Sequence, residues 1–245
     1  MSDAERSDLP STEAKKNATG RKSAAKANQR QLITDAASKL FQEQGYRKTS
    51  LSEIARQIGM DQSSIYYWFP SKEAIFEAIF DVNRAVPIIK RVKEEVTDRV
   101  VQLYMLIAYD VIRKCELPFD FVELESLVSE HPEKYQGLIE SYREYYQAFV
   151  DVITLGIEEG VFRECPADEQ AVTILSVNEG LQHHFHANVR GELLLIPCGY
   201  QVKHHSPEAV GFMAARTILP GMLTTQEDMR AIRDRAVAKL KEMGL

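Results

Sequence analysis

Apolar residues recur at helical spacing along most of the chain, and the interruptions between these runs predict a succession of helices. The first run occupies residues 28–44, and Gly45 follows it where a helix C-cap belongs. Its apolar positions are Leu32, Ile33, Ala36, Ala37, Leu40 and Phe41. One face of this segment is therefore expected to pack against the helices that follow.

Residues 49–72 predict two short helices separated by a tight turn. Ser50 and Glu53 form a capping box that starts the first helix, and Gly59 ends it. Asp61 is a candidate N-cap for the second helix. The second helix has Ile65, Trp68 and Phe69 as buried candidates and Gln62, Ser63, Ser64 and Tyr67 as outward side chains. Such a unit is suited to placing one helix in a DNA major groove.

The remainder of the chain predicts a longer set of helices. Ser71 caps a helix reaching Phe80, and Pro87 predicts a kink or an end near Val86. Later helices are expected near residues 88–116, 119–129, 132–160, 168–190, 206–220 and 226–243. The insert 191–205 has an apolar run that is compatible with a strand, a loop or an interface, and the pattern does not decide between them.

With no repeats and no long β-pattern, the fold class expected is all-α. The sequence has no apolar run of 18 residues and no signal peptide, so a soluble cytoplasmic protein without a membrane partner is expected. Cys115, Cys165 and Cys198 lack the spacing of metal ligands and are interpreted as reduced thiols.

The net charge of −6 alone argues against a nucleic-acid-binding protein, but the distribution of charge along the chain reverses that conclusion. Residues 15–75 carry eleven Lys or Arg against five acidic residues, whereas 76–245 carry eighteen basic against twenty-seven acidic residues. A basic segment on an acidic body is what a protein needs when one end touches DNA.

Residues 1–27 contain almost no large apolar side chain and are expected to be disordered. Six cationic residues, Lys22 and Lys26 among them, occur there and at Arg30 without an intervening acid. Either they form a solvated tail, or they form a basic arm that follows DNA phosphates.

Residues 45–73 resemble the N-terminal signature of the TetR family of bacterial regulators. The matching positions are Gly45, Tyr46, Thr49, Ser50, Ile54, Ala55, Gly59, Ile65, Tyr66, Phe69, Lys72 and Glu73. Ser63 stands where that family often has glycine, and Trp68 stands where it often has histidine. The resemblance implies a homodimeric transcriptional repressor with a linker helix between a DNA-binding domain and a ligand-binding body. Operator sequence does not transfer from relatives because of these departures.

Three domains are expected: a disordered arm at 1–27, a helix-turn-helix domain at 28–73, and an effector-binding and dimerisation domain at 74–245. The expected partners are double-stranded operator DNA, a second copy of the chain and a small, largely apolar effector. The DNA-binding candidates are Thr49, Ser50, Gln62, Ser63, Ser64, Tyr66, Tyr67, Lys72, Lys22 and Lys26. The dimer interface is expected on the 168–190 and 207–220 helices.

Aromatic residues form a stripe in the body that is compatible with a plain core or, within the resembled family, with an aromatic-walled cavity. Polar groups on a neighbouring helix would orient a ligand there. The ligand-binding candidates are Tyr104, Phe119, Tyr142, Tyr145, Phe149, Asn178, Glu179 and His183.

Glu179, His183 and His186 share a helix face with metal-capable spacing, which leaves a metal-responsive regulator as an alternative, beside an effector-free one. The favoured interpretation is a polar cavity or interface without metal. The chain carries no nucleophile–base pair and no phosphate-binding glycine loop, so neither enzymatic activity nor a cofactor is expected.

Overall fold

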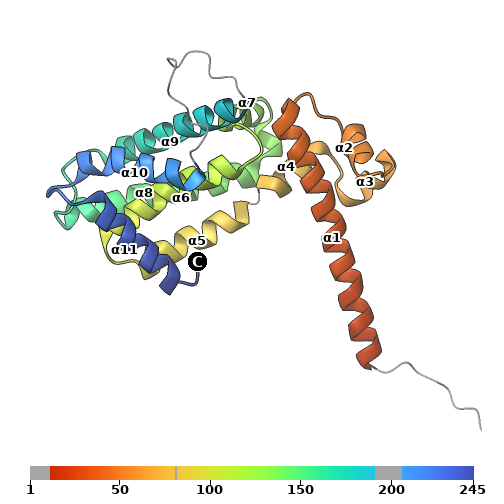
Figure 1. Cartoon of the computed structure of the whole chain (residues 1–245), viewed down its shortest axis with the longest axis horizontal. Coiled ribbons are helices and arrows are strands. Elements are labelled where there is room, and N and C mark those ends of the chain that lie inside the picture. Colours follow the sequence, from red (N-terminus) through yellow and green to blue (C-terminus); the bar gives the residue numbers. More distant parts are fainter. Residues whose placement is uncertain (1–11, 81, 191–205) are drawn as a thin grey trace, which may run out of the picture. The chain divides into compact units, whose positions relative to one another are not determined.

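The computed structural model describes residues 12–80, 82–190 and 206–245, so the 191–205 insert lies outside the described residues. The chain divides into two compact units, residues 1–76 and residues 77–245. Helices make up both units (Figure 1). The expected all-α class is confirmed, since the described residues contain no β-strand and only one isolated bridge, between Phe162 and Leu223.

The first unit contains α1 (Thr12–Gln44), α2 (Leu51–Gln57), α3 (Gln62–Trp68) and the start of α4 (Lys72–Phe80). Helix α1 begins at Thr12, so residues 12–27, for which disorder was expected, are helical. The physical reason is cooperativity, because a helix already nucleated at 28–44 gains one hydrogen bond for each added residue. The alanine, lysine and glutamate content of this stretch favours that extension.

Local sequence signals set the boundaries inside this unit. Gly45 and Gly59 have φ values of 84° and 66°, in the left-handed region that glycine tolerates best. Ser50 and Glu53 form the expected capping box, in which each side chain accepts a hydrogen bond from the other residue's backbone N–H. Asp61 occupies the N-cap position of α3, but its side chain makes no capping hydrogen bond.

The core of the first unit is formed by residues from all its helices. Its buried side chains are Ile33, Ala36, Ala37, Phe41, Tyr46, Ile54, Ala55, Ile65, Phe69, Ile75 and Phe76. The rings of Phe41 and Phe76 both contact Tyr46, at centroid distances of 5.1 and 4.9 Å. This packing fixes the orientation of the two short helices, which are too short to be stable alone.

The second unit is a bundle around α6 (Arg99–Glu116), which packs against α5, α8, α9, α10 and α11 (Figure 1). The other elements are α5 (Val82–Glu95), α7 (Phe121–Glu130), the 3₁₀ turn Pro132–Lys134, α8 (Gln136–Glu158), α9 (Ala167–Arg190), α10 (Pro207–Met222) and α11 (Met229–Glu242). Gly211 lets α10 approach α6 closely, because a Cβ there would lie 3.0 Å from the Ala108 carbonyl oxygen.

Two helices extend past a proline near which the sequence predicted an end or, at Pro87, a kink or an end. Helix α5 continues through Pro87 and has no end near Val86, and α10 continues through Pro220 to Met222. Each proline leaves one carbonyl oxygen of the preceding turn without its helical hydrogen bond; Pro220 does so in the last turn of α10, whereas Pro87 lies inside α5. Among the described residues, no helix has the length and apolar character needed to cross a membrane.

Candidate DNA-reading face and ligand pocket

Helix α3 has one buried face and one exposed polar face. Ile65 is fully buried and Phe69, just after the helix, is 1% exposed, whereas Gln62, Ser63 and Ser64 are exposed. Tyr66 and Tyr67 are also exposed, Tyr67 by 71%. Amide, hydroxyl and phenol groups therefore project outward from a single short helix, as direct reading of base edges requires.

Contacts from α1 hold α3 in place. The Arg30 guanidinium donates a hydrogen bond to the Trp68 carbonyl oxygen at 2.7 Å and lies 4.2 Å from the centre of the Phe69 ring. Trp68 is only partly buried, and its indole meets the Tyr67 ring edge-on at 5.0 Å. Arg30 therefore helps to position the exposed face of α3.

Three of the DNA-binding candidates have structural contacts. Thr49 is 2% exposed, and its hydroxyl donates to the Gly45 carbonyl oxygen at 2.9 Å. The Lys72 ammonium donates to the carbonyl oxygens of Tyr46 and Thr49, each at 2.8 Å. Ser50 is exposed and caps α2. These contacts stabilise the turn between α1 and α2. The Thr49 side chain does not project to the surface.

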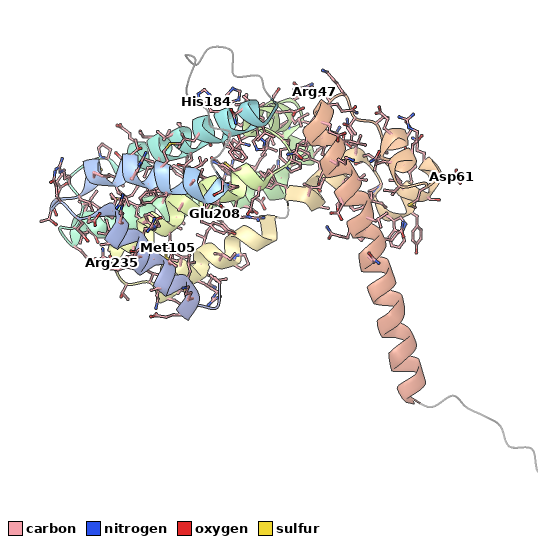
Figure 2. The ribbon with its side chains drawn as sticks, viewed as in Figure 1. Arg47, Asp61, Met105, His184, Glu208 and Arg235 are labelled. Carbon is pink, nitrogen blue, oxygen red and sulfur yellow. The ribbon has the colours of Figure 1, made fainter. Side chains whose placement is uncertain are left out.

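The sequence interpretation missed the exposed cations around this turn. Arg47, Lys48 and Arg56 are exposed, and Arg47 extends outward from the turn after α1 (Figure 2). Their proximity in sequence to the capping box of α2 was the available signal. Lys22 and Lys26 lie in the helical part of α1, but their side chains are outside the described residues.

The second unit holds a buried charged cluster between α6, α8 and α9. The side chain of Lys114 is 6% exposed, and its ammonium lies 3.2 Å from Asp110 and 3.3 Å from Glu179. The Tyr142 hydroxyl donates to the same Glu179 oxygen at 2.7 Å, and the Asn178 amide donates to Asp110 at 2.8 Å. Two carboxylates thus surround one ammonium group.

Burial and these carboxylates together disfavour ionisation of neighbouring groups. The pKa of Tyr142 is raised well above its ordinary value, first by burial and then by Glu179. Burial and then Asp110 raise the pKa of Tyr145, although its hydroxyl makes no hydrogen bond of acceptable geometry. Burial and then Glu179 raise the pKa of Glu125, and the charge of Lys114 only partly opposes them. In all three groups burial is the larger cause, and the nearby carboxylate adds to it.

Helix α9 also holds the turn that leads into α7. The Gln182 amide donates to the carbonyl oxygens of Lys114 and Phe119, and its oxygen accepts from the Phe121 backbone N–H. His183 Nδ1 lies 2.6 Å from Asp120, whose carboxylate also caps α7. These bonds set the position of α7 relative to α9.

The metal alternative finds no support in this geometry. Glu179 pairs with Lys114, His183 with Asp120, and His186 with the Lys114 carbonyl oxygen, so the three side chains have different partners. Across the described part of the chain, no three His, Cys, Asp or Glu side chains gather as a metal site would require. His184 is exposed on the outer side of α9 (Figure 2).

A pocket of about 460 Å³ lies beside the charged cluster, within the second unit. Its lining comes from the end of α4, from α7 and from α8: Phe80, Phe121, Leu124, Glu125, Val128, Ser129, Leu138, Ile139, Tyr142 and Arg143. The Phe80 ring stacks on Phe119 at 6.3 Å. The volume and the mainly apolar lining suit a small organic ligand.

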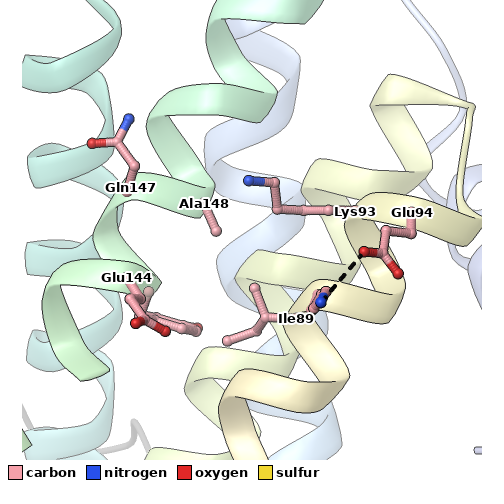
Figure 3. Close-up of a pocket in the computed structure, with 8 residues that line it drawn as sticks. Ile89, Lys93, Glu94, Glu144, Gln147 and Ala148 are labelled. Atoms are coloured by element: carbon pink, nitrogen blue, oxygen red, sulfur yellow. Dashed lines mark ion pairs between the residues drawn. The ribbon is translucent and has the colours of Figure 1, made fainter. Parts of the chain in front are cut away.

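A second cleft of about 420 Å³ lies between α5 and α8. Ile89 and Lys93 of α5 face Glu144 and Ala148 of α8 there, beside the Lys90–Glu94 ion pair (Figure 3). Lys93 is itself bound to Asp151 at 2.5 Å. Lys90 thus pairs with Glu94 within the cleft, whereas Lys93 pairs with a carboxylate of α8 outside its lining.

The predicted ligand residues do not line one cavity. Tyr104, Phe119 and Phe149 are buried core residues, Asn178 is fully buried, and His183 is 48% exposed beside Asp120. Tyr142 lines the first pocket and Tyr145 lines the second cleft. Sequence reasoning missed Asp110, Lys114 and Gln182. Their signal was polar residues at helical spacing within strongly apolar helices.

Comparison with known proteins identifies the first unit. Residues 33–79 match the model of bacterial regulatory proteins of the tetR family. The A-factor receptor protein of Streptomyces griseus is 43% identical over 49 residues, which cover 20% of this chain and 18% of that protein. The fatty acid metabolism regulator protein of Bacillus subtilis is 25% identical over 146 residues, which cover 54% of this chain and 70% of that protein.

The whole fold also has solved counterparts. One is the transcriptional regulator FadR from Bacillus subtilis in complex with stearoyl-CoA, with a TM-score of 0.54 and 19% sequence identity. The match covers 78% of this chain and 98% of that one, and at this identity it shows the fold. The helix-turn-helix unit and the family match agree, and residues 33–79 therefore form a helix-turn-helix domain of the tetR family of bacterial regulatory proteins, in a chain whose whole fold matches that solved transcriptional regulator.

Proposed function

We propose that this protein is a ligand-responsive transcriptional repressor that binds a palindromic operator as a homodimer. The observation that carries this proposal is the exposed face of α3, where Gln62, Ser63, Ser64 and Tyr67 project from a helix whose other face is buried. The hydroxyls and the amide are groups that distinguish base edges in the major groove. The exposed cations Arg47, Lys48 and Arg56 supply attraction to the phosphates.

Two copies of helix α3 are needed because one short helix covers only a few base pairs. The dimer is formed by α9 and α10, which pack together within one chain. Val172 and Val189 of α9 are exposed, and Phe212 and Met213 of α10 are only partly buried. Apolar side chains exposed on two adjacent helices are suited to a self-complementary interface.

The effector binds in the pocket lined by Phe80, Phe121 and Tyr142. Phe80 lies at the end of α4, and α4 begins at Lys72 inside the DNA-reading unit. A ligand that contacts Phe80 therefore touches the helix that continues into that unit. Release from DNA requires only that the ligand bind more tightly to the conformation of the protein that does not bind the operator. The stearoyl-CoA complex of a protein with this fold supports a ligand with a large apolar part.

Selection of bound duplexes from a random DNA pool by the full-length protein tests this proposal. Recovered sequences should contain two inverted copies of a short motif, with centres about 10–10.5 base pairs apart or a multiple of that spacing. A selection without protein controls for amplification bias. Recovery of no common motif would contradict sequence-specific DNA binding, and a single unrepeated motif would contradict the dimer.

A further inference from the structure

The charges beside the pocket are not balanced. Asp110 and Glu179 bring two carboxylates to the single Lys114 ammonium, at 3.2 and 3.3 Å. Asp110 and Lys114 are nearly inaccessible to solvent, and the side chain of Glu179 is 20% exposed. When all three groups are ionised, this buried cluster carries one excess negative charge. Such a charge is costly unless a further cation or donor approaches it.

Two buried polar atoms near this cluster also lack hydrogen-bond partners. The Asn178 side-chain oxygen makes no hydrogen bond, although the amide of the same side chain is bound to Asp110. The Tyr145 hydroxyl is also buried and makes no hydrogen bond of acceptable geometry, but it is a donor close enough to Asp110 for that carboxylate to help raise its pKa after burial. An acceptor oxygen left without a donor beside an excess of carboxylates indicates that donors, rather than acceptors, are in short supply here.

The pocket wall transmits this negative potential to a ligand. Tyr142 lines the pocket and donates a hydrogen bond from its hydroxyl to Glu179, which makes its ring more electron-rich. Phe121 also lines the pocket, and the Lys114 ammonium lies 4.3 Å from its ring centre, so the ring is already used for a cation–π contact. Glu125 provides a carboxylate in the lining itself, and its pKa is raised first by partial burial and then by the neighbouring Glu179.

We propose that the pocket between α4, α7 and α8 selects a cationic amphiphile, in which an ammonium or amidinium group joins an apolar body. The cation lies between the Glu125 carboxylate and the Tyr142 ring, and the apolar body lies along Leu124, Ile139 and Phe80. This inference rests on the proposed function, since it names the chemical class of that regulator's effector.

An anionic ligand does not fit the same surroundings. Lys114 is the buried cation nearest the pocket rings, and both of its partners are already carboxylates. Arg143 and Glu125 both line the pocket and both are exposed, so water screens the two charges alike, and the excess carboxylate of the buried Asp110–Lys114–Glu179 cluster decides the sign of the field. A carboxylate head group would meet Glu125 at the lining and the field of Glu179 behind Tyr142.

The test compares three probes of equal chain length: octylammonium, 1-octanol and octanoate. Their binding to the full-length protein is measured by isothermal titration calorimetry and by the shift in melting temperature. Octylammonium should bind at least about tenfold more tightly than 1-octanol, the effect expected of one charge-assisted contact, and octanoate should bind more weakly than both. Equal or tighter binding of octanol or octanoate would overturn the inference.

Two variants and a control assign the preference to this pocket. Glu125→Gln, at an exposed position, and Glu179→Gln, inside the cluster, should each reduce the preference for octylammonium over 1-octanol at least about threefold. Glu158→Gln removes an exposed carboxylate at the far end of α8, outside the pocket, and should leave the preference intact. An unchanged preference in Glu125→Gln would place the cation elsewhere and contradict the proposal, even if Glu179→Gln fails to fold.

The inference and the proposed function fail separately. If none of the three probes binds while the random-pool selection recovers an operator, the effector class proposed here is wrong and the DNA-binding function stands. If octylammonium binds with the expected preference but no operator is recovered, the ligand class stands and the regulatory function is wrong.

Discussion

At the scale of single residues, hydrogen-bond partners separate the side chains that hold the first unit together from those available to DNA. Thr49 and Lys72 direct their polar groups to carbonyl oxygens of the turn between α1 and α2. Gln62, Ser63 and Ser64 are exposed at the N-terminal end of α3. We therefore expect substitutions at the first pair to affect folding, and substitutions at the second group to affect sequence discrimination.

Gln62→Ala should weaken binding to the selected operator by roughly 1–3 kcal/mol, because a bidentate amide contact to a base is worth about that much. Binding to random-sequence DNA should change little, since phosphate contacts supply it. Fluorescence anisotropy with both duplexes measures the difference. Gln226→Ala, an exposed glutamine of the second unit, is the matched control. Equal loss on both duplexes would show that Gln62 contacts only phosphate.

The sequence predicted the exposed face of α3 well because its amphipathic pattern is local. The capping box of Ser50 and Glu53 and the burial of Ile65 follow from neighbours within a few residues. The ligand pocket depends on residues brought together from distant positions, such as Lys114 and Glu179. Aromatic spacing on α8 indicated a stripe, but it could not tell that Phe149 lies in the core while Tyr142 lines a pocket.

At the scale of elements, close approach between chain segments fixes how α8 and the segment after it pack. Gly156 lies on α8, and a Cβ built there would overlap the ring of Phe162, which is itself 2% exposed. The backbone N–H groups of Val161 and Phe162 both bond to the Gly156 carbonyl oxygen. The glycine in the last turn of this long helix is thus required by the turn that follows it.

Gly156→Ala should destabilise the protein by about 1–3 kcal/mol, because the added methyl group must displace a buried ring. Gly137→Ala is the matched control on the same helix, since a Cβ there meets nothing within 4 Å. That substitution should be neutral or stabilising by up to about 1 kcal/mol through helix propensity. Urea denaturation measures both, and a Gly156→Ala protein as stable as the original would contradict the packing described.

The helices themselves were largely predictable, and the errors concern their ends. Helix α1 starts at Thr12 instead of Asn28, since the absence of apolar residues removes packing but leaves helix propensity in place. Pro87 predicts a kink or an end near Val86, and the structure has no end there because α5 runs through the proline. The spacing of apolar residues reveals the buried face of a helix, so it does not reveal helical turns that have no buried face, such as those at the start of α1.

At the scale of the whole molecule, the proposed reading of DNA and the proposed binding of an effector belong to different units. Eleven basic residues against five acidic ones lie in 15–75, whereas 76–245 is acidic. Attraction to DNA is thereby confined to the unit that carries α3, and the unit that carries the pocket is kept from the phosphates by its charge. Helix α4 connects the two and contributes Phe80 to the pocket.

The most direct measurement is the affinity of the full-length protein for the selected operator and for a scrambled duplex of the same composition. Both are titrated at one fixed salt concentration, because the phosphate contribution depends steeply on salt. The proposal predicts binding to the operator at least about 10³-fold tighter than to the scrambled duplex, with two chains bound for each operator. Equal affinity for the two duplexes would contradict the assignment of α3 as a reader of DNA sequence.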